Sequence, residues 1–432
     1  MAKDRIKSVK GMHDLFEVDL ATWRKLERAA QDTFTAFGYG EIRTPILEKT
    51  ALFVRGVGEA TDIVSKEMFR FDDSGGDGGK VTDVCMRPEG TAAVVRALLQ
   101  AGKLTPDSDE RVFYMGPMFR RERPAKGRFR QFFQLGAEAF GFTRPSIDVE
   151  MMAMVQTLLD ELGLTGVKLL INTLGDPEDR AAYTEALKGY YQDHFDKLSD
   201  DAKDRLEKNP LRLLDGKEDV LVELAKDAPK IDGFLGDAAK AHFDDVREGL
   251  TRLKIPFVVE PKLVRGLDYY TRTVFEAVAE SGLGAQNAVA AGGRYDGLVE
   301  QLGGKSMPGV GFAAGIERLV LLLEDAGKKL DKQPPQLMLI AADDAGRNAA
   351  EVLALDLRRQ GTCVEVDHRG AKMKAQIRRA DRASIPFVVV LGSREVEDGK
   401  GQLKKMATGD VQDVDLTADA LSAGLQTLSS AS

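Results

Sequence analysis

Cysteine and histidine are both scarce in this chain. Cys85 and Cys363 are the only cysteines among 432 residues, and they stand far apart and outside any CxxC arrangement. Their scarcity excludes a disulfide framework, argues against structural zinc and is typical of the reducing cytoplasm, where we expect the protein to work. The four histidines form no HxH or HExxH spacing, so we expect no transition-metal site either.

Long hydrophobic runs and the common nucleotide-binding loops are also missing. Apolar stretches such as LVLLL at 319–323 fall far short of the ~20 residues that span a bilayer. No apolar run follows the basic first residues, so we expect no secretory signal. The GxxxxGK[ST] loop fails at Val81, which follows Lys80, and GGKS at 303–306 has Val299 in place of the first glycine. No GxGxxG follows an expected strand, which excludes the dinucleotide fingerprint.

The composition describes a globular protein with ample core. A hydrophobic fraction of 43% and a charged fraction of 30% over 432 residues predict two or three domains. The net charge of −8 does not suggest a nucleic-acid binder, yet residues 119–130 and 369–382 each carry a net charge of +5. Either window alone is typical of a solvated face, but together they allow a two-point contact with a polyanion.

Periodicity predicts a large α+β domain dominated by antiparallel strands. Apolar residues at helical spacing indicate helices at 20–37 and 148–162. Pro45 places the strand within EIRTPILE at an edge or boundary of a sheet. Residues 111–141 read as a strand, a basic loop and a second strand.

The second half of the chain predicts an insertion and a further domain. Helices rich in Lys, Asp and Ala dominate residues 177–254, and strand signals resume from 255. A polar linker at 326–336 precedes 337–432, which alternates strand and helix as βαβαβ with a final helix. That pattern is typical of an open α/β domain.

The stretch LVRGLDYYTRTVFEA, residues 263–277, carries many charges for a strand that is partly buried. Alternation would put Arg272 and Glu276 on the same face as Tyr270, and would turn Tyr269 to the other face. An ordinary ion pair between Arg272 and Glu276 is one interpretation. Arg265 and Tyr270 favour a binding site, because Gly266 between them would allow a ligand close to the backbone.

Three other segments offer polar side chains at turns or strand ends. Glu89 and Thr91 stand where a strand becomes a helix, so they either cap that helix or bind an ammonium group. FQLGAE presents Gln134 and Glu138 at the end of a strand. AGGRYDG offers Arg294 and Tyr295 on a loop flanked by glycines.

These segments in this order resemble the histidyl-tRNA synthetases, which are class II aminoacyl-tRNA synthetases. The similarity covers nearly the whole chain, and RPEGT, RGLDYY and GGRYDGL are its most specific parts. The resemblance implies a six-stranded antiparallel catalytic sheet flanked by helices, a helical insertion and a C-terminal α/β anticodon-binding domain. It divides the chain into catalytic segments at 1–176 and 255–325, the insertion at 177–254, the linker at 326–336 and the anticodon-binding domain at 337–432.

The resemblance also implies the reaction and its partners. Such an enzyme activates L-histidine with ATP, together with Mg²⁺, to histidyl-adenylate and pyrophosphate, then transfers histidine to the 3′ end of tRNA(His). EIRTP matches the first motif of the class, which implies a homodimer. Attack of a carboxylate on an α-phosphate depends mainly on positioning and on preorganised cations.

The residue roles follow from the same resemblance. Arg120 and Arg265 would grip the α-phosphate as the catalytic pair, and a carboxylate with phenols would read the two ring nitrogens of histidine. Tyr269 belongs to the same motif, although alternation turns it away. The implied sets are ATP-binding Arg120, Arg128 and Arg318; imidazole-binding Glu138, Tyr270 and Tyr295; ammonium-binding Glu89, Thr91 and Gln134; and tRNA-binding Arg123 and Lys126.

Two rival functions remain at this point. The regulatory subunit of ATP phosphoribosyltransferase resembles the same catalytic domain, but it generally lacks the C-terminal domain and degrades the motifs, which are intact here. An RNA-binding or scaffolding protein would use only the basic windows. A different amino acid as substrate is disfavoured, because RGLDYY and GGRYDGL are typical of the histidine enzymes.

The loop RPAKGRFRQFFQ departs from the family pattern RPQKGRYRQFHQ, since Ala125 and Phe133 replace polar residues. In the family this loop faces the tRNA acceptor end, where an extra 5′ guanosine is read. We predict weak dependence on that nucleotide, because a side chain able to read a base edge is lost. Aminoacylation of tRNA(His) with and without it measures this, and a loss of about tenfold or more on deletion would contradict the prediction.

Overall fold

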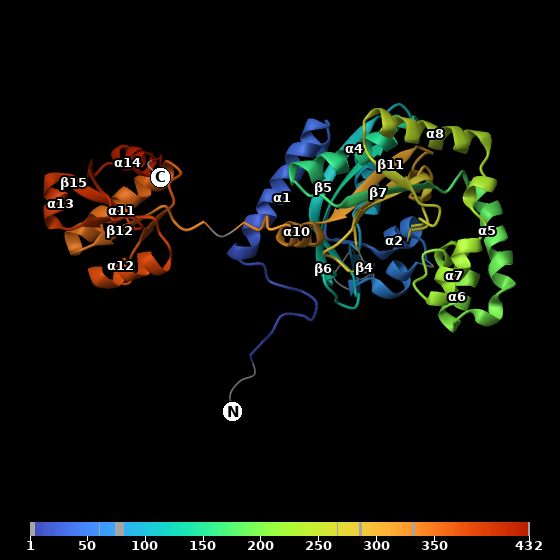
Figure 1. Ribbon diagram of the computed structural model, residues 1–432, viewed down its shortest axis with the longest axis horizontal. Helices are drawn as coiled ribbons and strands as arrows, with labels where there is room; N and C mark the ends of the chain where they lie inside the picture. Colours follow the sequence, from blue (N-terminus) through green and yellow to red (C-terminus); the bar gives the residue numbers. More distant parts are fainter. Residues whose placement is uncertain are drawn as a thin grey trace. The chain divides into compact units, whose positions relative to one another are not determined.

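The computed structural model describes residues 5–59, 61–73, 82–265, 267–284, 287–330 and 333–430. The chain forms two compact units, Met1–Leu330 and Asp331–Ser432, which divide inside the expected linker (Figure 1). No helix among the described residues is long and apolar enough to cross a membrane. Gly266, to which the sequence assigned close approach of a ligand, lies outside the described residues.

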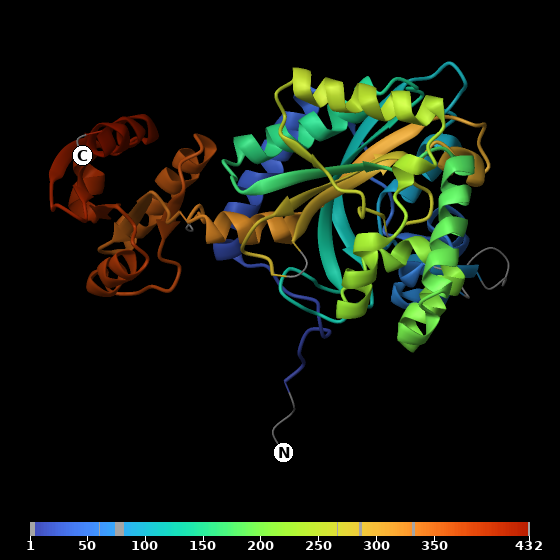
Figure 2. The same ribbon diagram turned by 45° about the vertical axis from the view of Figure 1, so that its right-hand side comes forward.

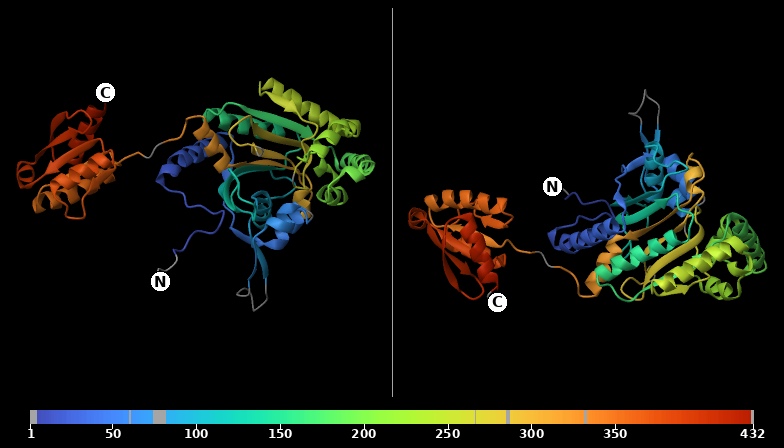
Figure 3. Two further views of the ribbon diagram at one scale, coloured as in Figure 1. Left: turned by 60° about the horizontal axis from the view of Figure 1, so that its bottom comes forward. Right: turned by 90° about the horizontal axis from the view of Figure 1, so that it is seen from above.

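A mixed eight-stranded sheet forms the centre of the first unit. Its six inner strands are antiparallel to their neighbours, which confirms the expected six-stranded sheet, and a short parallel strand extends each edge. Figure 3 shows strands from the early and late parts of this unit side by side. The order is β1 (Gly40–Glu41), β5 (Glu110–Phe119), β6 (Gln131–Phe140), β11 (Gly309–Gly315), β10 (Ala288–Arg294), β9 (Thr271–Ala279), β7 (Val167–Thr173) and β8 (Phe257–Val259).

Four helices bury their apolar stripes in the core beside this sheet: α1 (Glu17–Ala36), α4 (Ser146–Glu161), α8 (Asp237–Arg252) and α10 (Ile316–Asp325). The first two confirm the helices expected at 20–37 and 148–162. In α1, Trp23, Leu26, Ala30 and Phe34 recur every three or four residues and are buried, as expected of an amphipathic helix. Figure 2 shows α4 and α8 running beside each other.

A small three-stranded sheet forms separately from the large one in the same unit. It contains β2 (Leu47–Lys49), β4 (Thr82–Met86) and β3 (Arg70–Asp73), in that order. Pro45 separates β1 from β2, so the proline marks a strand boundary as predicted. Around this sheet lie α2 (Thr50–Val57), a π-helix at Ile63–Glu67, α3 (Thr91–Gln100) and, further along the chain, α9 (Leu298–Gln301).

The region from 177 to 254 is helical, in the form α5 (Pro177–Gln192), α6 (Asp200–Lys208), α7 (Asp219–Asp227) and α8, with three short 3₁₀ turns. Side chains of α5, α6 and α7, such as Leu187, Leu206 and Leu221, pack into one cluster. In contrast, α8 buries Phe243 and Val246 in the core that α4 shares. Packing therefore sets α8 apart from the other three helices, and the exact limits of an insertion domain remain a prediction.

The second unit has its own five-stranded sheet in the order β13–β12–β14–β15–β16. The first three strands are parallel and alternate with helices, as predicted, whereas the hairpin of β15 and β16 was not predicted. The elements are β12 (Leu337–Ala341), α11 (Asp344–Arg359), β13 (Val364–Val366), α12 (Met373–Arg382), β14 (Phe387–Leu391), α13 (Ser393–Asp398), β15 (Lys400–Lys405), β16 (Val411–Asp415) and α14 (Ala418–Ser430).

A buried ion pair joins α4 to β10. Arg294 Nη2 lies 2.5 Å from Asp148 Oδ2, and the two side chains are 1% and 0% exposed. His242 of α8 lies 3.4 Å from the same carboxylate. Arg294 is thus the last residue of a strand and faces the core, so its predicted place on a ligand-binding loop is wrong.

Replacing Arg294 by Met is predicted to lower the free energy of unfolding of the first unit by about 3–5 kcal/mol, because Asp148 would stay buried without its main partner. Urea denaturation followed by the fluorescence of Trp23, the only tryptophan, measures this. Arg247→Met is the control, because Arg247 and its partner Asp244 are about half exposed, and it should change stability by at most about 0.5 kcal/mol. Equal effects of the two changes would contradict the prediction.

Candidate active site

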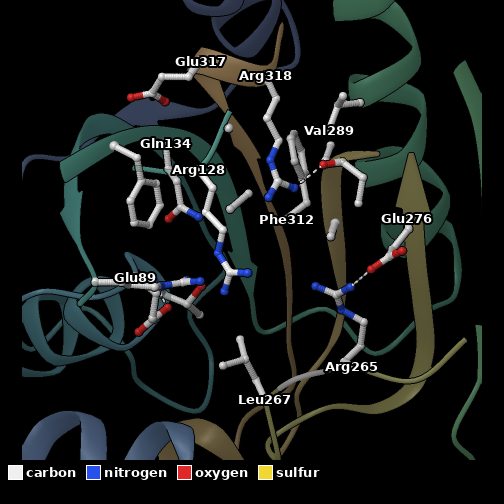
Figure 4. Close-up of a pocket in the computed structure, with 18 of the residues that line it drawn as sticks. Glu89, Arg128, Gln134, Arg265, Leu267, Glu276, Val289, Phe312, Glu317 and Arg318 are labelled. Atoms are coloured by element: carbon white, nitrogen blue, oxygen red, sulfur yellow. Dashed lines mark hydrogen bonds and ion pairs between the residues drawn. The ribbon is translucent and has the colours of Figure 1, made fainter. Parts of the chain in front are cut away.

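A cavity of about 250 Å³ lies over the central strands of the large sheet. Its walls come from β5, β6, β9, β10 and β11, the starts of α3 and α10, the basic loop between β5 and β6, and the residues before β9. Figure 4 shows Arg128, Arg265 and Arg318 pointing into it from separate segments. The cavity gathers chemistry that is scattered along more than 200 residues of sequence, since Glu89 and Arg318 both line it.

Most of the predicted site residues meet in this cavity. Nine of them line it: Glu89, Thr91, Arg120, Arg128, Gln134, Arg265, Tyr269, Tyr270 and Arg318. Glu138 and Tyr295 lie directly behind its wall, where both are buried and bonded to each other. Arg123 and Lys126 do not line the cavity but are exposed on the basic loop.

Guanidinium groups reach the cavity from several segments of the chain. Arg120 Nε donates to the Pro88 carbonyl at 2.9 Å, Arg318 Nη1 donates to the Ala288 carbonyl at 2.5 Å, and Arg265 forms an ion pair with Glu276. Burial lowers the pKa of Arg120 and of Arg318, and the neighbouring charges lower the pKa of Arg318 further. A bound polyphosphate would relieve this repulsion.

Arg128 reaches the cavity from the basic loop. Its guanidinium is paired with Glu122 and lies 3.6 Å from a carboxylate oxygen of Glu67. Gly127, with φ +68°, turns the loop tightly here, where Ala125 and Arg128 exchange two backbone hydrogen bonds. The loop therefore holds Arg128 inward and leaves Ala125 exposed.

Carboxylates and hydroxyls lie beside these guanidiniums. Glu89 accepts the backbone N–H groups of Thr91 and Ala92 at 2.7 and 2.9 Å, so it caps α3, one of the two roles considered for it. Thr91 Oγ1 donates to Glu138 at 2.6 Å, and the Tyr295 hydroxyl donates to the other oxygen of the same carboxylate. Burial raises the pKa of Glu89, and raises that of Glu138 to about 8.

Gln134 carries an acceptor with no partner. Its Oε1 is buried, and no hydrogen-bond donor among the described residues reaches it. Gln134 and Glu138 lie within β6 rather than at its end, and alternation puts both on the cavity side. An ammonium group in the cavity would satisfy this oxygen.

Tyr269 and Tyr270 both line the cavity, which contradicts the predicted alternation. Their ring centroids are 4.7 Å apart, and the Tyr269 ring lies 5.4 Å from that of Tyr295. The reason is that β9 begins only at Thr271, and Arg272 with φ +47° interrupts the extended backbone. Tyr269 is therefore not turned away.

The proposed ion pair between Arg272 and Glu276 is also wrong. Glu276 pairs with Arg265, whereas Arg272 makes two bonds to Asp176, at 2.6 and 3.1 Å. Thus β9 provides Glu276, the carboxylate that orients the Arg265 guanidinium in the cavity. Its own Arg272 instead binds Asp176 at the start of α5.

Several lining residues escaped the sequence analysis. Tyr114 stands opposite Gly136 on the neighbouring strand, and a Cβ at Gly136 would lie 2.6 Å from the Tyr114 ring. Glu317 accepts the Phe133 N–H at 2.9 Å, and burial raises its pKa to about 7. A Cβ at Gly311 would lie 1.8 Å from Glu138 Oε2, so only glycine fits there. The one signal in the sequence was Gly136, between Gln134 and Glu138, because a glycine within a strand can mark the close approach of another side chain.

Phe133 does not belong to the loop that was predicted to face tRNA. It lies within β6, and its ring packs edge-on against Trp23 with centroids 5.2 Å apart. The prediction about the 5′ nucleotide therefore depends on Ala125 alone.

The donor groups do not suggest a resident metal ion. In the part of the chain that is described, no three His, Cys, Asp or Glu side chains gather as metal ligands. The glutamates that line the cavity are already engaged with guanidinium or backbone N–H groups.

Comparison with known proteins agrees with this geometry. Residues 11–319 match the family described as histidyl-tRNA synthetase, and residues 336–426 match the family described as anticodon binding domain. A histidine–tRNA ligase of Anaeromyxobacter dehalogenans is 46% identical over 96% of this chain and 98% of its own. One from Trichlorobacter lovleyi is 46% identical over 97% and 98%. The crystal structure of the apo histidyl-tRNA synthetase of S. aureus, 36% identical, aligns over 98% of this chain and 100% of that one with a TM-score of 0.79.

The raised pKa of Glu138 predicts a pH-dependent contribution to stability. The folded state keeps its proton up to about pH 8, whereas the unfolded state releases it near the ordinary value of 4.5, so stability falls as pH rises through this window. Glu138→Gln does not titrate. Its free energy of unfolding relative to the unsubstituted protein should therefore increase with pH, by roughly 1 kcal/mol per pH unit. Urea denaturation between about pH 5 and 8 measures the difference, and a difference independent of pH would contradict the assignment.

Proposed function

The chain belongs to the histidyl-tRNA synthetase family, and from that membership we propose that the cavity is where histidine and ATP react. The protein is a histidine–tRNA ligase, since relatives with that activity are 46% identical over nearly its whole length. It joins L-histidine to ATP, releasing pyrophosphate, and then transfers histidine from the adenylate to tRNA. The observation that carries the assignment of the site is the meeting of guanidinium groups and a buried carboxylate–phenol cluster in one cavity.

Arg120 and Arg265 stabilise the first step. A carboxylate oxygen of histidine forms a bond to the α-phosphorus of ATP, the bond to the β-phosphate bridge breaks, and pyrophosphate leaves. Negative charge accumulates on the phosphoryl oxygens, and the guanidiniums of Arg120 and Arg265, which both line the cavity, would bind these oxygens. Both keep their charge at any working pH, so the site depends on their positions rather than on a proton transfer.

The buried cluster selects the substrate. Glu138, held by Thr91 and Tyr295, faces the imidazole together with Tyr270 and the neighbouring Tyr269. A carboxyl group whose pKa is about 8 can be protonated or ionised near neutrality, so it can either donate to or accept from a ring nitrogen. Amino acids without such a ring would leave these groups unpaired.

The histidine ammonium group fits between Glu89, Thr91 and Gln134. The orphan oxygen of Gln134 supports this placement most directly. Glu89 contributes negative charge, while its bonds to α3 fix its position.

ATP extends toward Arg128 and Arg318, and Mg²⁺ enters with it. Mg²⁺ commonly takes one or two carboxylates together with substrate phosphates, and Glu122 and Glu276 stand at the phosphate end of the cavity. Bound there, the ion would neutralise charge on the β- and γ-phosphates.

The remaining partners are a second copy of the chain and tRNA. The segment 41–45 and the exposed Ile46 and Leu47 suit an interface with a second copy of the chain, and Arg123 and Lys126 suit the tRNA backbone. The second unit would bind the anticodon, with residues 177–254 as an insertion in the catalytic domain and 326–336 as the linker. The cytoplasm is the proposed location.

The regulatory-subunit alternative is disfavoured. The second unit matches the anticodon binding domain over residues 336–426, and the cavity retains Arg120, Arg265 and Arg318. Histidine-dependent exchange of pyrophosphate into ATP tests the choice, because neither a regulatory subunit nor a simple RNA-binding protein would catalyse it. Exchange that depends on glycine, proline or threonine in place of histidine would overturn the assignment of histidine as the substrate.

Arg265→Lys is predicted to lower kcat/KM for this exchange by about 10²–10³, because an ammonium cannot donate to phosphate and Glu276 in the geometry of a guanidinium. The control is Arg247→Lys on α8, which should exchange at the original rate. Original activity in Arg265→Lys would remove Arg265 from the catalytic role.

A further inference from the structure

Residues 267–272, called the tyrosine loop below, carry Tyr269 and Tyr270 into the cavity and are held from outside it. Arg180, near the start of α5, is partly buried and reaches the back of this loop. Its Nη1 donates to the carbonyl of Asp268 at 2.9 Å and to the carbonyl of Tyr270 at 3.1 Å. The two bonded carbonyls flank Tyr269, so one side chain of the helical region sets the backbone on both sides of that residue.

The end of the tyrosine loop is held by the residues that begin α5. The Arg272 N–H donates to the Gly175 carbonyl at 2.9 Å, and the Leu174 N–H donates to the Arg272 carbonyl at 2.7 Å. Asp176 caps α5 and also accepts both bonds from the Arg272 guanidinium. This double attachment compensates for the positive φ of Arg272, which residues with a side chain adopt at a cost.

A third contact comes from the end of α6. The Asn209 amide donates to Asp268 Oδ1 at 2.9 Å. On the other side, a Cβ at Gly58 would lie 2.8 Å from Asp268 Oδ2, so Asp268 fits closely between α2 and α6. None of these three holding residues, Asp176, Arg180 and Asn209, lines the cavity.

From these contacts we propose that Asp176, Arg180 and Asn209 are positioning residues for the amino-acid pocket. They place the tyrosine loop so that Tyr269 and Tyr270 face the substrate ring, and a shift of α5 and α6 moves both tyrosines with them. The proposal rests on the proposed function, because it needs these tyrosines to contact histidine. The guanidiniums of Arg120 and Arg318, which are proposed to bind ATP, are held by other contacts, from the carbonyls of Pro88 and Ala288. The two substrates should therefore respond differently.

The test is pyrophosphate exchange with Arg180→Met, which keeps an unbranched apolar side chain and removes its donors. We expect KM for histidine to rise about tenfold or more, with KM for ATP unchanged. Lys226→Met on α7 is the matched control, since its exposed partner Glu223 is on the same helix and neither touches the loop. If KM for both substrates rises equally, or neither rises, the proposal is wrong.

Three further variants keep the test valid should Arg180→Met fold poorly, which a thermal melt would show. Asp176→Asn preserves a cap for α5 and weakens the attachment of Arg272, so it should also raise KM for histidine alone. Arg272→Gly tolerates the positive φ and Arg272→Ala does not, so the glycine variant should bind histidine more tightly than the alanine variant. The reverse order would contradict the proposal. Absence of histidine-dependent exchange in the unsubstituted protein would instead refute the proposed function.

Discussion

Positive charge gathered in one partly enclosed cavity is the constraint on which the site depends. Arg120, Arg265 and Arg318 come from three separate segments, and like charges at short range in a protein interior repel strongly. Glu122 and Glu276 reduce this cost by ion pairing, while the carbonyls of Pro88 and Ala288 fix two of the guanidiniums. Phosphate oxygens can compete for the same hydrogen-bond donors. The ion pairs and carbonyl bonds that reduce the repulsion between the guanidiniums therefore also hold them in place for a nucleotide.

The sequence predicted the elements whose signals are local. The apolar stripe of α1, the proline between β1 and β2 and the alternation of strand and helix in the second unit each depend on a few neighbouring residues. The hairpin of β15 and β16 is largely polar, so its sequence has no hydrophobic strand pattern. Its strands are defined by pairing with each other and with β14. The two short parallel strands at the sheet edges and the packing of α8 on α4 depend on distant partners that no local pattern contains.

The residues of the candidate site also divide into those that the sequence predicted and those that it missed. Motif residues such as Arg120, Arg265 and Gln134 were found because their segments resemble a known family, and the structure brings them together. Tyr269 was misplaced because strand alternation was assumed to start too early, before the left-handed residue Arg272. Tyr114 and Glu317 were missed because each acts through a partner on another strand, Gly136 and Phe133 respectively. Periodicity reports which face a residue occupies, but not what lies opposite.

Gly311 has a consequence for how the pocket could change over evolution. Any side chain at this position would collide with Glu138 and with the carbonyl of Ala137, at 1.8 and 2.6 Å from the new Cβ. Filling the ring-binding end, the simplest mutational path toward a smaller amino acid, would therefore displace the carboxylate that Thr91 and Tyr295 hold. A substitution at Gly311 would therefore narrow the pocket and disturb its buried carboxylate in the same step.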